Sequence, residues 1–257
     1  MKTGCVSSPL AIHAQRQSTH KWLCKVFYND LSELYTMTKH VNINDSILPI
    51  EELHLTYITH KIRNDYGYLE SSKTEVPVNG NGEIIPLYTY PCYEYLNSFD
   101  WTGCKVFEFG SGYSTVWWNR LGAEVHGVDM SQDWADKYDK VMYEPDIKNF
   151  PQSIYKCNTK FDVITLDCSH VRYQCVVPAL ECLNDGGVIV LDNSEQWTNT
   201  KELLDTDDTL IPVHFHGFKA LHVESETTSC YLHRDFSKKA KTILPMAGTE
   251  RKPPDSA

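Results

Sequence analysis

The segment "VFEFGSGYST" (residues 106–115) decides the fold that we expect for this chain. Apolar residues lead to Glu108, and two glycines follow as Gly110-Ser111-Gly112. A glycine has no Cβ, so its backbone can turn sharply and lie close to a ligand. The apolar run before the glycines and the amphipathic stretch after them predict a strand, a tight loop and a helix, in that order.

The same alternation continues along the chain. The apolar runs "CKVFEF", "EVHGVD", "KFDVITLD" and "VIVLDN" are separated by segments with helical spacing. This order is typical of β-α-β units and of a parallel sheet covered on both faces. The later stretch "LIPVHFHGFKALHVESETTSCYLHRDF" predicts two more strands with an antiparallel finish. We therefore predict an α/β, Rossmann-like sheet of seven mostly parallel strands with an antiparallel last strand.

The sequence pattern divides the chain into three parts. Residues 1–85 are mixed in pattern, with helical spacing over residues 20–41, and predict an N-terminal helical extension that caps the substrate pocket. Residues 86–236 contain the regular alternation and form the predicted Rossmann domain. Residues 237–257 are polar and contain proline, so we expect a disordered tail.

The composition restricts the class of partner. The 257 residues carry a formal net charge of −10. A nucleic acid partner requires Lys and Arg side chains that neutralise its phosphates. The charge therefore argues against nucleic acid binding and favours a small-molecule substrate.

Cysteine usage and hydropathy predict the compartment. The nine cysteines include no CxxC pair, which indicates reduced thiols rather than a disulfide framework or a zinc site. The first twenty residues lack the apolar run of a signal peptide, and no segment approaches the roughly 18 apolar residues of a membrane span. We expect a soluble, cytoplasmic protein without a membrane partner; the oligomeric state stays open.

Acidic residues follow the predicted strands. Ligands of open α/β sheets bind beyond the carboxyl ends of the strands, where the pattern places Glu108, Asp129, Asp167 and Asp192. Asp129 stands seventeen residues beyond Gly112 (129 − 112), where a carboxylate can accept hydrogen bonds from ribose hydroxyls. These positions predict a nucleoside-containing ligand.

A dinucleotide site is the first alternative. Its fingerprint has a third glycine, which allows a helix to approach a pyrophosphate. This chain has Thr115 at that position, with Glu108 before the loop. Both residues disfavour an NAD-dependent oxidoreductase.

Residues 86–236 resemble the class I S-adenosylmethionine-dependent methyltransferases. The resemblance rests on Glu108, Gly110 and Gly112 as E-x-G-x-G, on Asp129 after the second strand, and on "FDVITLD". It implies that the glycine loop holds the methionine end of the cofactor and that Asp129 binds the ribose. The implied cofactor site comprises Glu108, Gly110, Ser111, Gly112, Asp129, Asp146 (toward the adenine) and Asp167.

A narrower resemblance concerns a metal ion. Asp167, Asp192 and Asn193 match the positions of the metal ligands in the metal-dependent catechol- and caffeoyl-CoA-type O-methyltransferases. Oxygen ligands suit Mg²⁺, Mn²⁺ or Ca²⁺, and a bound cation lowers the pKa of a substrate hydroxyl. That subgroup continues after its first acid with a second Asp and a Lys, whereas this chain reads "DCSHVRYQC". Asp192 and Asn193 therefore either hold a cation or contact the acceptor directly.

Methyl transfer is an in-line displacement, and a hydroxyl acceptor must also lose its proton. The candidate catalytic residues are Asp167, His170, Asp192 and Asn193, with Arg172 as a candidate grip for a substrate carboxylate or phosphate. We expect a methyltransferase acting on a small molecule, with oxygen favoured over nitrogen as the acceptor. The alternatives are a catalytically silent cofactor-binding scaffold or sensor, and the NAD-dependent oxidoreductase.

Overall fold

A computed structural model describes residues 40–43, 46–241, 243 and 245–248 of the chain. The chain divides into two compact units, and the larger one comprises His60–Gly248. The smaller unit contains the described residues that precede it. Residues 60–85, which the sequence pattern assigns to the N-terminal extension, thus belong to the same unit as the sheet.

The smaller unit contains a two-stranded hairpin. Strands β1 (His40–Ile43) and β2 (Ser46–Pro49) pair antiparallel, and α2 (Ile50–His60) follows directly. The helix expected over residues 20–41 lies outside the described residues up to residue 39. Its last two residues begin β1 instead of continuing a helix.

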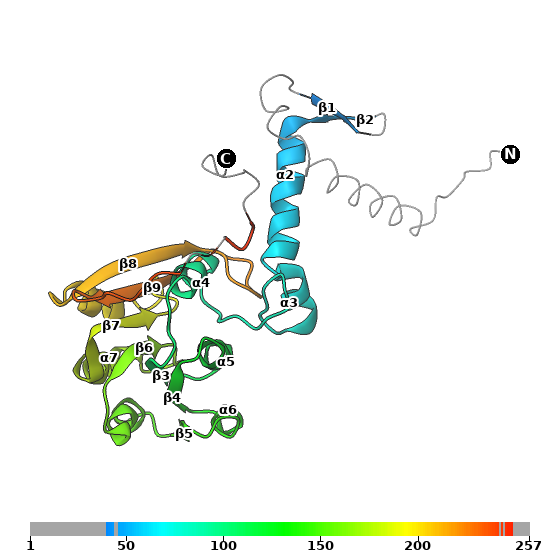
Figure 1. Ribbon diagram of the computed structural model, residues 1–257. Coiled ribbons are helices and arrows are strands. Elements are labelled where there is room, and N and C mark those ends of the chain that lie inside the picture. The colour runs from blue at the N-terminus through cyan, green and yellow to red at the C-terminus, as the bar shows by residue number, and fades with distance from the viewer. Residues whose placement is uncertain (1–39, 44–45, 242, 244, 249–257) are drawn as a thin grey trace. The chain divides into compact units, whose positions relative to one another are not determined.

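The larger unit contains a seven-stranded sheet in the order β5-β4-β3-β6-β7-β9-β8 (Figure 1). The strands are β3 (Lys105–Phe109), β4 (Glu124–Asp129), β5 (Val141–Tyr143), β6 (Phe161–Leu166), β7 (Leu183–Leu191), β8 (Leu210–Gly217) and β9 (Glu226–His233). The β3–β4, β3–β6, β4–β5 and β6–β7 pairs are parallel, whereas β9 runs antiparallel to both β7 and β8. The predicted fold class, with its antiparallel last strand, is confirmed.

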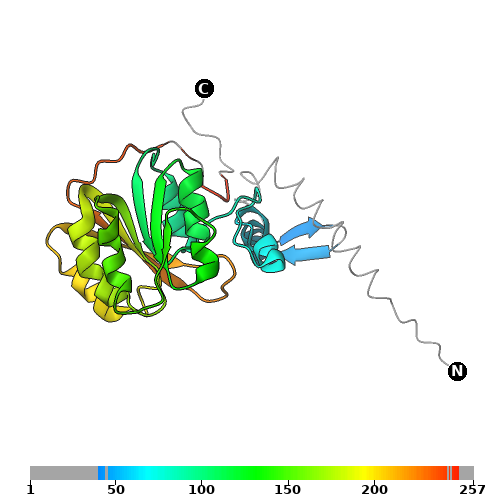
Figure 2. The same cartoon turned by 90° about the horizontal axis from the view of Figure 1, so that it is seen from below.

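Helices cover both faces of this sheet (Figure 2). The helices of the larger unit are η1 (Lys61–Asp65), α3 (Tyr68–Thr74), α4 (Tyr90–Asn97), α5 (Tyr113–Arg120), α6 (Gln132–Ala135), η2 (Phe150–Cys157), α7 (Arg172–Cys182) and α8 (Thr198–Asp205). The first of these, with α2, confirm the predicted N-terminal helical part. In the described part of the chain, no helix has both the length and the hydropathy needed to cross a membrane.

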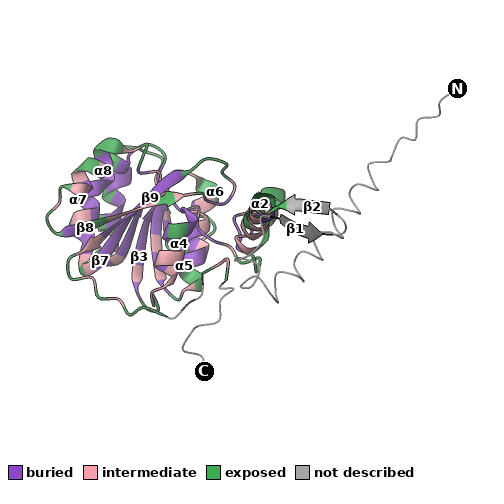
Figure 3. Cartoon of the chain, turned by 90° about the horizontal axis from the view of Figure 1, so that it is seen from above, coloured by how far each residue is buried: buried purple, intermediate pink, exposed green. Residues whose placement is uncertain are grey.

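Each face of the sheet has its own hydrophobic core (Figure 3). Phe107 and Phe109 of β3 lie in the core that also contains residues of η2, α7 and α8. Val106 lies in the other core, with Trp117 and Trp118 of α5. Side chains alternate across a strand, so Glu108 is directed to the α5 side together with Val106.

Residues 238–241, at the start of the predicted tail, are bonded to the rest of the larger unit. Ala240 forms a bridge with Phe99, and the Asp100 N–H donates to the carbonyl oxygen of Lys239 at 3.1 Å. The Lys238 ammonium lies 3.5 Å from an Asp162 carboxylate oxygen. We expected disorder from residue 237 onward, but backbone pairing and this ion pair hold residues 238–241.

Candidate functional site

A cavity of about 310 Å³ lies at the carboxyl ends of β3, β4 and β6. It is lined by Leu87, Gly110, Ser111, Gly112, Tyr113, Ser114, Asp129, Met130, Trp134, Phe150, Asp167, Cys168 and Ser169. The structure thus brings together five of the seven residues predicted for the cofactor. The other two, Glu108 and Asp146, do not line the cavity.

The two glycines of the loop have different requirements. Gly110 has φ +94°, and a Cβ there would lie 2.8 Å from the carbonyl oxygen of Asp167. Gly112 has an extended φ of −177°, and a Cβ there would have no atom within 4 Å. The fold therefore requires the first glycine. The second leaves space in the wall of the cavity, which fits a ligand that approaches the backbone closely.

The chain's own side chains fix the backbone of the loop. The Ser111 N–H donates to one carboxylate oxygen of Asp129 at 2.8 Å, and the Ser131 N–H donates to the other at 2.6 Å. The Gly112 N–H donates to the Thr115 hydroxyl at 3.1 Å. These N–H groups consequently have partners and are not free donors for a phosphate.

Glu108 lies behind the loop and is fully buried. The Thr115 hydroxyl donates to its Oε2 atom. Burial raises the pKa of Glu108 to about 8; hydrogen bonds from Thr115 and Ser114 oppose this rise, and the Asp167 and Asp129 carboxylates add to it. A role for Glu108 toward the cofactor stays a prediction, because its side chain is not part of the cavity wall.

Three buried polar atoms near the loop have no hydrogen-bond partner among the described residues: Glu108 Oε1, Ser111 Oγ and Thr165 Oγ1. Thr165 stands opposite Glu108 in the pairing of β3 with β6. Buried polar groups are nearly always hydrogen-bonded to protein, water or ligand. Of the three residues, only Ser111 lines the cavity, so only its hydroxyl is placed to meet a bound molecule.

Asp167 follows β6 and contributes a carboxylate to the cavity. Its Oδ1 atom accepts a hydrogen bond from Arg172 Nη2 at 2.8 Å, and 31% of the side-chain surface is accessible. Loss of solvent within the site raises the pKa of Asp167 to about 7. The Asp192 carboxylate adds to this rise, and Arg172 and Lys219 oppose it. Asp167 can therefore exchange a proton near neutral pH.

Arg172 joins the ends of two strands. Its Nε atom donates to the Cys168 carbonyl oxygen at 2.7 Å, Nη1 donates to the Asp192 carbonyl oxygen, and Nη2 contacts Asp167. Only 7% of the side-chain surface is accessible. The expectation that Arg172 grips a substrate is wrong, because its side chain is buried and each of its three guanidinium nitrogens already donates to an acceptor within the protein.

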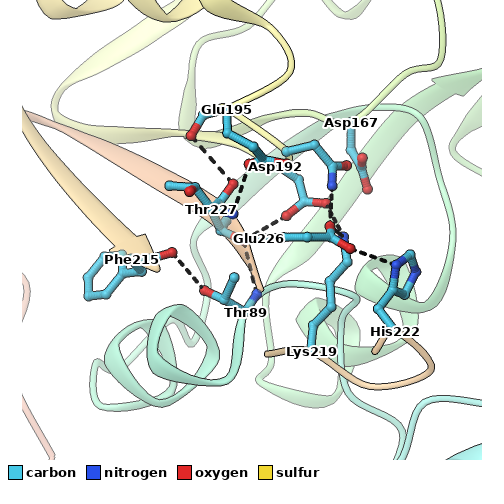
Figure 4. Close-up of polar contacts among 12 residues, drawn as sticks. Thr89, Asp167, Asp192, Glu195, Phe215, Lys219, His222, Glu226 and Thr227 are labelled. Carbon is cyan, nitrogen blue, oxygen red and sulfur yellow. Dashed lines mark hydrogen bonds and ion pairs between the residues drawn. The ribbon is translucent and has the colours of Figure 1, made fainter. Parts of the chain in front are cut away.

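Asp192 and Asn193 follow β7. Asp192 is bonded to Lys219 of the β8–β9 connection (Figure 4), and Asn193 to Glu226 at the start of β9. Asp192 is 2% exposed. Its Oδ2 atom lies 3.0 Å from Lys219 Nζ, and its Oδ1 atom accepts a hydrogen bond from the Thr228 hydroxyl at 2.6 Å. Asn193 has φ +51°, and its amide nitrogen donates to a carboxylate oxygen of Glu226. Neither predicted residue lines the cavity.

The predicted metal ligands are already bound to other groups of the protein. Mg²⁺ requires an octahedron of oxygen ligands. Asp192 is engaged by Lys219 and Thr228, and Asp167 by Arg172. No group of three or more His, Cys, Asp or Glu side chains within residues 40–43, 46–241, 243 and 245–248 is arranged to hold a metal ion. The predicted set, as placed, does not fit a divalent cation.

His170 and Asp146 lie outside the cavity wall. Both are exposed. The Asp146 carboxylate accepts hydrogen bonds from the Lys148 N–H at 2.9 Å and from the Asn149 amide at 3.1 Å, so it caps its own turn. Their roles as a general base and as an adenine contact stay predictions.

The sequence did not indicate Leu87, Met130, Trp134 or Phe150 as wall residues, nor the buried lysine Lys219. The additional lining residues are Leu87, Tyr113, Ser114, Met130, Trp134, Phe150, Cys168 and Ser169. Proximity to Asp129 could have indicated Met130 and Trp134. No sequence signal indicates Lys219, which lies in a connection between two strands.

No protein-family model and no curated protein matches the sequence. Solved structures with a similar fold include the cofactor-bound Rv0187 from MTB, with 15% identity over 70% of this chain and 90% of that chain, at a TM-score of 0.48. Another is the O-methyltransferase TomG from Streptomyces achromogenes in complex with SAM, with 12% identity over 56% and 77% of the two chains and a TM-score of 0.43. A third is an rRNA methylase from Streptococcus thermophilus, with 12% identity over 56% of this chain and 95% of that chain and a TM-score of 0.40. At these values, no activity or ligand carries over from them.

The two glycines provide a matched pair of substitutions. We expect Gly110→Ala to lower the free energy of unfolding by about 2 kcal/mol or more, because the new Cβ meets backbone atoms and φ is positive. Gly112→Ala should change it by less than about 0.5 kcal/mol, yet weaken ligand binding in the cavity. Urea unfolding and calorimetric titration with S-adenosylhomocysteine measure the two effects. Equal destabilisation by both substitutions would contradict this assignment.

The raised pKa of Glu108 should make the stability of the fold depend on pH. A pKa raised from 4.5 to about 8 means that the folded state binds the proton more tightly, so stability falls as pH rises through this interval. Glu108→Gln removes this penalty. As the pH rises from about 5 to 8, the free energy of unfolding of the variant should therefore increase relative to that of the wild type by up to about 1.4 kcal/mol per pH unit. Urea unfolding across this range measures the difference, with the exposed Glu202→Gln as the control; parallel curves for wild type and Glu108→Gln would refute it.

Proposed function

We propose that the chain is an S-adenosylmethionine-dependent methyltransferase and that the cavity at the glycine loop holds the cofactor. One observation carries the proposal: the acidic residues Asp129 and Asp167 line the cavity, and its thirteen lining residues include no Lys or Arg. A cavity of this charge favours a ligand with positive groups, such as a sulfonium and an ammonium, over an anionic one.

The wall also offers suitable contacts for a nucleoside. Each oxygen of Asp129 accepts one backbone N–H, and an ionised carboxylate has about four acceptor positions, so two remain for ribose hydroxyls. Met130, Trp134 and Phe150 supply apolar and aromatic surface for a base. The volume of about 310 Å³ lies at the lower end of the range for small-molecule sites.

When bound, the cofactor supplies a methyl group on a sulfonium, whose carbon–sulfur bond breaks as the acceptor forms its bond to that carbon. A hydroxyl acceptor also releases a proton. Asp167 lines the cavity and has a pKa near neutrality, so it is the carboxylate best suited to take this proton. Arg172 holds one oxygen of Asp167 and leaves the other without a hydrogen bond to a neighbouring described side chain.

The acceptor in this proposal is a small molecule, with a hydroxyl favoured over an amine. The net charge of −10 and the acidic cavity both weigh against an RNA or DNA acceptor. The cytoplasm is the proposed site of action, consistent with nine cysteines that include no CxxC pair.

The proposal differs from its two alternatives in measurable ways. An NAD-dependent oxidoreductase would bind a pyrophosphate at the loop, but Asp129 and Thr115 already accept the N–H groups of Ser111 and Gly112. A catalytically silent scaffold would bind the same cofactor without turnover across a panel of acceptors.

Ligand preference tests the cofactor assignment. We expect S-adenosylhomocysteine to raise the Tm and NAD to leave it unchanged, because the cavity is acidic and its loop offers few free N–H donors. Asp129→Asn should weaken S-adenosylhomocysteine binding at least about tenfold, which corresponds to roughly 1.4 kcal/mol. The exposed Asp139→Asn is the control and should bind as the wild type does. Stabilisation by NAD alone would overturn the assignment.

The pH profile tests Asp167. With any hydroxyl acceptor found in a panel of phenols and catechols, kcat/KM should rise about tenfold from pH 6 to pH 8 as a carboxyl of pKa about 7 ionises. Asp167→Asn should lower kcat by about 10²- to 10⁴-fold and flatten this rise. An unchanged profile in the variant would assign the proton transfer to another group.

A further inference from the structure

Lys219 is a cation buried among acids. It is 2% exposed, and its Nζ atom lies 3.0 Å from Asp192 Oδ2 and 2.5 Å from Glu226 Oε2 (Figure 4). The other oxygen of Glu226 lies 2.7 Å from His222 Nδ1. A lysine seldom lies this deep unless its charge is paired. Here two carboxylates from separate strand ends meet at one ammonium.

The ammonium is held in its charged form. Burial by itself would lower the pKa of Lys219, but Asp192 and Glu226 together outweigh it, so the pKa is raised. Without Lys219, the two buried carboxylates would repel one another, and no positive charge at this position would compensate theirs. The acids at the ends of β7 and β9 thus require a cation between them.

The same residues were the candidates for a metal ion. Asp192 and Asn193 are two of the three predicted ligands. Asp192 contacts Lys219 itself, and Asn193 contacts Glu226, which also contacts Lys219. A second, divalent charge about 4 Å from the ammonium would be repelled, strongly so in a buried site. Lys219 and a divalent cation are therefore alternatives for one position.

We infer that the Lys219 ammonium holds the cation position at the end of β7, so that this acidic cluster binds no divalent cation while Lys219 is in place. The inference concerns the cluster formed by Asp192, Glu226 and Asn193, and it holds whether or not the cavity binds S-adenosylmethionine. It also assigns Lys219 as the residue that compensates charge beside Asp167, a role that a metal ion would otherwise fill.

Manganese binding tests the inference without an activity assay. Titration of the full chain with Mn²⁺, followed by electron paramagnetic resonance of free Mn²⁺, should show no saturable site in the wild type. Lys219→Ala should lower the Tm. Millimolar Mn²⁺ or Ca²⁺ should then raise the Tm of this variant by about 5 °C, because ligands that bind only the folded state stabilise it. The double variant Lys219→Ala with Asp192→Asn should lose this recovery, and Lys148→Ala on the surface is the control.

Two outcomes would overturn the inference. One is a single Mn²⁺ site in the wild type that Asp192→Asn abolishes. The other is a folded Lys219→Ala variant whose Tm does not respond to the cation. If Lys219→Ala fails to fold, the comparison of wild type with Asp192→Asn still decides, because it needs no substitution at Lys219.

Discussion

The backbone of Gly110 lies so close to the end of β6 that a Cβ would come within 2.8 Å of the carbonyl oxygen of Asp167. This approach sets the distance between the glycine loop and the strand that carries the cavity's most perturbed acid. The loop can then receive the Asp129 carboxylate from the other side, at the Ser111 N–H. The glycine loop after β3 thereby contacts the ends of both β4 and β6, and the cavity lies beside these contacts.

Electrostatics at this edge depend on an imbalance of charge. Parallel strands end at the same edge of a sheet, so Glu108, Asp129, Asp167 and Asp192 are brought together. Arg172 and Lys219 offset part of this charge from within the protein, at the β6 and β7 ends. No such base lines the cavity. The uncompensated charge is therefore concentrated there, where a cationic ligand would complete the balance.

The sequence predicted the features that depend on local pattern. Alternating apolar runs located six of the seven strands, but β5 (Val141–Tyr143) is too short to show a period. The glycine loop and Asp129 were also located, because their spacing follows from a strand-loop-helix unit. Lys219 was not, since it lies 27 residues from Asp192 in a connection and meets it only through the fold. Arg172 was misassigned, because sequence does not reveal that its guanidinium is buried.

Thr115 shows how one local change alters what a loop can bind. In a dinucleotide site a glycine at this position lets the helix approach a pyrophosphate. Here the Thr115 hydroxyl accepts the Gly112 N–H and donates to Glu108. The same side chain thus withdraws a donor from any phosphate and ties the buried acid to the loop. Both effects shift the preference of the site from anions toward cations, and they do so through a residue that never reaches the cavity wall.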